Sequence, residues 1–130
     1  FAVADILKEK GFNDDYQAAG LLHDTLEDTN ATKEEILKLS NKGVLDTVVL
    51  LTKEKEYKMQ DYYNRIINSD MAKMVKLADR YHNLSESTMT NIFFKKKYLK
   101  ETEEWYLKMA EGTCFEEDIK QELDNLIKSL

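Results

Sequence analysis

The near absence of helix-breaking residues is the feature that most constrains the fold of this 130-residue chain. The sequence contains no proline and only four glycines. Proline removes a backbone donor and glycine leaves the backbone too free, so both residues interrupt helices. Strong helix formers such as Leu, Glu, Lys and Ala fill much of the remainder. We therefore expect an all-α fold.

Composition limits the size and the surroundings of the protein. Apolar residues make up 42% of the chain, enough for one compact domain over residues 1–130 without disulfides. Cys114 is the single cysteine, and no apolar run is long enough to cross a bilayer, so we expect a cytoplasmic protein without membrane contact. The net charge of −6 disfavours nucleic acid as a partner. The sequence predicts no particular oligomeric state.

Capping signals and apolar spacing predict where the helices begin and end. A helix over residues 1–10 should end at Gly11, where a left-handed residue can close it. Asn13 or Asp14 can cap a second helix, which we expect to run towards Glu27. Further helices are expected over residues 32–39 (opened by a Thr32–Glu35 capping box, with Ile36, Leu37 and Leu39 as its apolar stripe), 44–51 (after a junction at Gly43), 57–68, 71–84 (capped by Asp70), 91–111 and 115–130.

The second predicted helix carries polar residues that can bind a metal. His23 and Asp24 follow the apolar pair Leu21 and Leu22, and imidazole and carboxylate are good ligands for a divalent transition metal. Glu27 lies four residues after His23 and projects on nearly the same helix face, with Asp28 beside it. A His-Asp dipeptide alone is more often a core histidine held by hydrogen bonds.

A second polar group lies near the end of the helix predicted over residues 71–84. Asp79 follows an apolar segment, and Asn83 lies one turn later on the same face. Asp79 can therefore supply a metal ligand from a separate helix, or it can form a salt bridge with Arg80 or Lys76.

Two strings, GLLHDTLEDTNAT and, about fifty residues later, KLADRYHN, closely resemble the hydrolase domain of the RelA/SpoT family and its small single-domain relatives. The resemblance implies an HD-domain helical bundle that hydrolyses the nucleotide guanosine-3′,5′-bis(diphosphate), ppGpp, to GDP and pyrophosphate. It implies three kinds of site residue: the Mn²⁺ ligands His23, Asp24 and Asp79, the acids Glu27 and Asp28 that act on water, and Asn83 beside the ribose.

Two departures from the family pattern leave alternatives open. The family places a further metal-binding histidine in an HPxAVA string, and this chain begins at Phe1-Ala2-Val3-Ala4, so we expect that histidine just before Phe1. Because the sequence starts inside a helix, we also expect an N-terminal helix before it. Ser85 and Glu86 stand where family members often have Arg-Thr. The substrate can therefore be another nucleotide or a nicotinamide dinucleotide phosphate, and a catalytically silent nucleotide-binding module also stays open.

Overall fold

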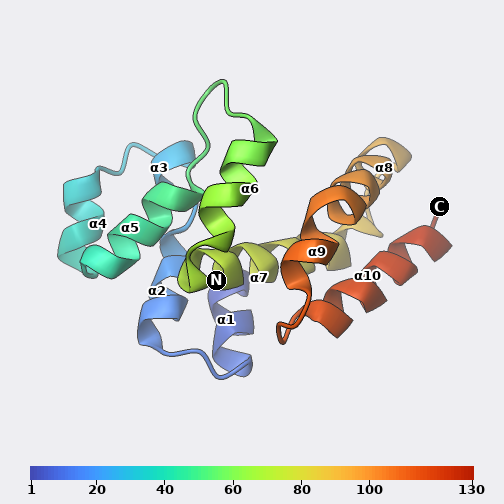
Figure 1. Cartoon of the computed structure of the whole chain (residues 1–130), viewed down its shortest axis with the longest axis horizontal. Coiled ribbons are helices and arrows are strands. Elements are labelled where there is room, and N and C mark those ends of the chain that lie inside the picture. Colours follow the sequence, from blue (N-terminus) through green and yellow to red (C-terminus); the bar gives the residue numbers. More distant parts are fainter. The chain divides into compact units, whose positions relative to one another are not determined.

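The computed structural model describes residues 1–130 and contains helices but no strand (Figure 1). This confirms the predicted all-α fold class and is consistent with an HD-domain helical bundle. The chain divides into two compact units, residues 1–76 and 77–130. No helix is both long enough and apolar enough to span a membrane.

The first unit contains the His-Asp pair, which lies between α2 (Asp14–Leu22) and α3 (Thr25–Asp28). Its helices are α1 (Ala2–Glu9), α2, α3, α4 (Lys33–Leu39), α5 (Lys42–Leu51), α6 (Met59–Ile67) and the beginning of α7 (Asp70–Ser87). The second unit contains the remainder of α7, then α8 (Ile92–Glu101), the π-helical segment η1 (Thr102–Tyr106), α9 (Leu107–Ala110) and α10 (Glu116–Lys128).

The connection between α1 and α2 follows its sequence signals closely. Gly11 has a φ of 86°, and the N–H of Phe12 donates to the carbonyl of Leu7 at 3.0 Å, which closes α1 as predicted. The Asn13 side chain then accepts hydrogen bonds from two backbone N–H groups in the first turn of α2. This settles the choice of cap in favour of Asn13.

A close approach between α1 and α2 depends on Gly20. A Cβ atom at this position would lie 2.8 Å from Leu7 Cδ1 and 3.3 Å from Val3 Cγ1. Both neighbours are buried in the core of the first unit. The missing side chain therefore lets α2 pack directly on α1, and it fixes the part of α2 that leads into the His-Asp pair.

Three local predictions about the next helices need correction. The Thr32–Glu35 capping box opens α4 as expected, but only Ile36 of the predicted apolar stripe is buried, while Leu37 and Leu39 are exposed. Asn41 caps α5, so the predicted junction at Gly43 lies inside that helix. The Ser69 hydroxyl accepts the N–H of Ala72 at 3.2 Å, so Ser69 caps α7 in place of the predicted Asp70.

The second unit has a charged residue at the centre of its packing. The Arg80 side chain is 5% exposed and pairs with Glu101 across 3.1 Å. Its guanidinium carbon also lies 4.2 Å from the centre of the Tyr106 ring. Helix α10 packs against α8 and α9, and the helix expected over residues 91–111 is interrupted by the π-helical turn of η1.

Candidate metal and catalytic site

The helix that carries the candidate ligands is interrupted at the ligands themselves. We expected α2 to continue towards Glu27, but it ends at Leu22, and the short helix α3 begins at Thr25. The Thr25 hydroxyl donates to the Leu22 carbonyl at 2.8 Å, so a side chain takes the place of a helical N–H. Asp24 lies in the bridge region of backbone space, with φ of −111° and ψ of 6°. The expectation that His23 and Glu27 share one continuous helix face was therefore wrong.

One ring nitrogen of His23 is held by a backbone carbonyl. The Nδ1 atom of His23 lies 2.6 Å from the Gly20 carbonyl oxygen. Because a carbonyl can only accept, Nδ1 carries the proton in the neutral ring and Nε2 carries the lone pair. Nε2 lies 4.0 Å from Asp24 Oδ2, and the His23 side chain is 19% exposed. A ligating histidine typically donates its other ring N–H to a backbone carbonyl in this way, so the pair fits a divalent cation.

Glu27 is tied to a segment far away in sequence. Its Oε1 atom accepts a hydrogen bond from the backbone N–H of Lys53, in the loop after α5. The side chains of Glu27 and of its neighbour Asp28 are exposed to solvent. The structure thus holds one carboxylate oxygen of Glu27 by a hydrogen bond, in a residue that is otherwise exposed.

Asp79 and Asn83 lie on α7, in the second unit, and both are partly buried. Asn83 Nδ2 donates to Asp79 Oδ1 at 3.4 Å, which confirms that the two side chains share one helix face. The nearby cation Arg80 pairs with Glu101. The structure thus brings together His23 with Asp24, and Asp79 with Asn83, as two pairs. No group of three or more His, Cys, Asp or Glu side chains is placed to hold a metal ion.

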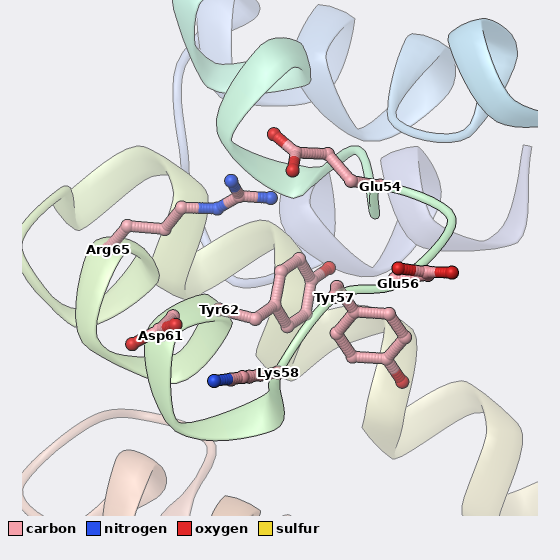
Figure 2. Close-up of a pocket in the computed structure, with 7 residues that line it drawn as sticks. All are labelled: Glu54, Glu56, Tyr57, Lys58, Asp61, Tyr62 and Arg65. Carbon is pink, nitrogen blue, oxygen red and sulfur yellow. The ribbon is translucent and has the colours of Figure 1, made fainter.

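A pocket opens between the loop after α5 and α6. Its volume is about 180 Å³, and Figure 2 shows the side chains that line it: Glu54, Glu56, Tyr57, Lys58, Asp61, Tyr62 and Arg65. Tyr62 and Tyr63 are buried, whereas Tyr57 is 42% exposed. The charged string EKEYK marks this loop in the sequence, but its connection to Glu27 is visible only in the structure.

Comparison with known proteins finds relatives that are named as enzymes of ppGpp metabolism. No family model matches the chain. A probable guanosine-3′,5′-bis(diphosphate) 3′-pyrophosphohydrolase of Mycoplasma pneumoniae is 36% identical over 71% of the chain and 15% of its own length. A protein of the same activity from Spiroplasma citri is 43% identical over 51% of the chain and 10% of its own length. A GTP pyrophosphokinase from Brucella ovis is 30% identical over 95% of the chain and 18% of its own length.

A solved structure supports the fold independently. A Listeria monocytogenes protein of known crystal structure superposes with a TM-score of 0.72, over 96% of this chain and 92% of its own. Its sequence identity of 22% supports a shared fold alone.

The helical fold and the His-Asp pair at a helix junction define the class, an all-α protein consistent with an HD-type bundle. The relatives then confirm the resemblance to the RelA/SpoT family that the two motif strings carry. The chain spans 10% to 18% of the length of these curated relatives.

Proposed function

We propose that the protein is a metal-dependent phosphohydrolase that converts ppGpp to GDP and pyrophosphate. The observation that carries the proposal is the orientation of His23, whose Nδ1 is engaged by the Gly20 carbonyl while Nε2 faces Asp24. The activity for which the Mycoplasma and Spiroplasma relatives are named supports the choice of substrate.

His23 and Asp24 would hold Mn²⁺ or a similar divalent cation, and the family resemblance assigns Asp79 as a further ligand. A cation bound there supplies positive charge that stabilises the phosphoryl group and acidifies water. The chemistry of the donors fits, because a neutral imidazole nitrogen and carboxylate oxygens suit Mn²⁺.

Glu27 and Asp28 would manage the protons of the reaction. The oxygen of water forms a bond to the phosphorus attached to the ribose 3′ oxygen, and the bond from that phosphorus to the 3′ oxygen breaks. Glu27 takes a proton from the water, and Asp28 assists protonation of the departing 3′ oxygen, so that GDP and pyrophosphate are released. Asn83 would position the ribose.

A nucleotide panel tests this proposal. With Mn²⁺ present, we expect ppGpp to be cleaved to GDP and pyrophosphate, measured by chromatography, faster than nucleotides without a 3′-phosphate group. Glu27→Gln keeps the shape of the side chain but removes the base, so turnover should fall roughly 100-fold while Mn²⁺ stays bound by elemental analysis. Asp24→Ala should lose both Mn²⁺ and turnover.

The panel also separates the alternatives. Preference for a nicotinamide dinucleotide phosphate or a 5′-monophosphate would contradict ppGpp as the substrate. These nucleotides are included because the exposed acid Glu86 departs from the family pattern. Absence of turnover with any nucleotide would favour a binding module instead of an enzyme. Near-full activity of Glu27→Gln would show that Glu27 is not the base.

A further inference from the structure

We propose that Arg65 is a positioning residue that orients the Glu27 carboxylate through a single peptide group. The inference rests on the proposed function, in which Glu27 takes a proton from the attacking water. It adds a residue from α6, which neither motif string contains, to the machinery of the reaction.

Side chains of α6 hold the carboxyl end of α5. The last carbonyls of a helix have no helical partner and need another donor. The Tyr62 hydroxyl donates to the Leu51 carbonyl at 2.7 Å, and Arg65 Nη2 donates to the Thr52 carbonyl at 2.7 Å. The cation of Arg65 is also favourable at the negative end of the α5 dipole. Two successive carbonyls are therefore fixed by one neighbouring helix.

The Thr52 carbonyl and the Lys53 N–H belong to the same planar peptide group. In a trans peptide these two bonds point in opposite directions, so a donor that fixes the oxygen also fixes the direction of the N–H. The Lys53 N–H donates to Glu27 Oε1. Arg65 and Glu27 thus bind the two ends of one peptide group. Each hydrogen bond polarises the peptide group and so strengthens the other hydrogen bond.

The Arg65 side chain is held firmly enough to serve this role. Its guanidinium carbon lies 5.3 Å from the centre of the Tyr62 ring, and the Tyr62 side chain is 2% exposed. Figure 2 shows both side chains projecting from α6 towards the loop after α5. The ammonium groups of Lys53 and Lys76 each lie 5.5 Å from the same ring. The Tyr62 ring therefore supports the Arg65 guanidinium. We call the arrangement in which Arg65 and Glu27 bind the two ends of the peptide group between Thr52 and Lys53 the peptide clamp.

The consequence for Glu27 is loss of rotational freedom in an otherwise exposed side chain. With Oε1 held by the Lys53 N–H, the directions that Oε2 can take are restricted. A base that is already oriented contributes to the rate of the chemical step, because its ordering cost is met before substrate binds. The clamp should therefore affect kcat and not KM.

Kinetics of Arg65 variants in two backgrounds test the proposal. Arg65→Met should lower kcat for ppGpp about 10-fold, with KM changed less than about twofold, because misplacement of a catalytic group acts on the chemical step. Arg65→Lys keeps a cationic donor and should recover most of the loss. In the Glu27→Gln background Arg65→Met should cause little further loss, since residues that act through one group are not additive. Equal losses in both backgrounds would overturn the positioning role.

Amide exchange at Lys53 gives a readout that does not depend on activity. The Lys53 N–H should exchange faster in Arg65→Met and Glu27→Ala, and stay protected in Glu27→Gln, whose side-chain oxygen still accepts. Lys42→Met removes an exposed cation from the other end of α5 and should leave Lys53 protection and kcat unchanged. Unchanged Lys53 exchange in Arg65→Met overturns the clamp alone. Absence of turnover in the wild type overturns the proposed function, and with it the catalytic role of the clamp, whatever the exchange rates.

Discussion

The Tyr16 hydroxyl donates a hydrogen bond to Asp70 Oδ2 at 2.5 Å and joins α2 to the start of α7. This hydrogen bond, with partial burial and the negative charge of Asp70, raises the pKa of Tyr16 from 10.0 to about 12. The folded state therefore favours the neutral phenol more strongly than the unfolded state does. Asp70 thus serves α7 as a tertiary acceptor, although its position in the sequence suggested a helix cap.

The raised pKa of Tyr16 predicts how stability changes in alkali. The stabilisation is fully present below pH 10 and is lost as the pH rises to about 12, because the unfolded phenol ionises first. Tyr16→Phe should be less stable than the wild type at pH 8, and this gap should close between pH 10 and 12. Urea unfolding midpoints measure it. The exposed Tyr57→Phe variant should follow the wild-type pH profile, and a Tyr16→Phe gap that stays constant with pH would contradict the assignment.

Residue types in sequence predicted which side chains could carry chemistry, but not how they are held. The sequence shows that His23 and Asp24 carry donor atoms a divalent metal can bind, and that they follow the apolar pair Leu21 and Leu22. The tautomer of His23 could not be predicted, because it depends on the Gly20 carbonyl, which the end of α2 presents to the ring. The fixed oxygen of Glu27 depends on Lys53, a residue without any periodic relation to it. Roles that arise from tertiary contacts leave no such pattern.

At the scale of elements, local signals predicted helix ends well where the cap lies within the same few residues. Gly11, Asn13 and the Thr32–Glu35 box act within one turn of chain, so the sequence contains the whole interaction. The break after Leu22 escaped prediction because apolar spacing continues through it. The Leu22 carbonyl accepts a hydrogen bond from the Thr25 hydroxyl, and apolar spacing does not predict this choice of donor.

The close packing of α2 on α1 predicts that Gly20→Ala destabilises the protein. Ala is the better helix former, so Gly20→Ala should stabilise α2 by about 1 kcal/mol if the helix were alone. The added Cβ would lie 2.8 Å from Leu7 Cδ1, and Leu7 is fully buried. Because overpacking a core costs about 1 to 3 kcal/mol, we expect a net loss of stability in thermal or urea unfolding.

Gly43→Ala is the matched control for Gly20→Ala. Gly43 also lies inside a helix, but its added Cβ would meet only the exposed Asn41 side chain, at 3.3 Å. Its unfolding midpoint should be equal to or higher than that of the wild type. A Gly20→Ala protein as stable as the Gly43→Ala protein would show that Leu7 adjusts without cost.

At the scale of the whole molecule, composition predicted the fold class because helix content is a property of the entire chain. Absence of proline, scarcity of glycine and 42% apolar residues pointed to a helical core, and the structure has no strand. The division into two compact units had no counterpart in the sequence, because no linker composition marks the boundary inside α7. Global content is thus easier to predict than the grouping of elements.

Metal binding should stabilise the folded protein against heat. The change in Tm on adding Mn²⁺ therefore tests the proposed ligands without a substrate. An ion that binds only the folded chain adds RT ln(1 + [M]/Kd), about 2.7 kcal/mol at 100 times Kd, so Mn²⁺ should raise Tm by roughly 10 °C. Asp24→Ala should abolish the shift, and so should Asp79→Ala, whereas Glu27→Gln should retain it. Protons compete for imidazole and carboxylate donors, so the shift should shrink in acid. A wild-type Tm that does not change on adding Mn²⁺, or a full Tm shift in Asp24→Ala, would rule out His23 and Asp24 as the metal site.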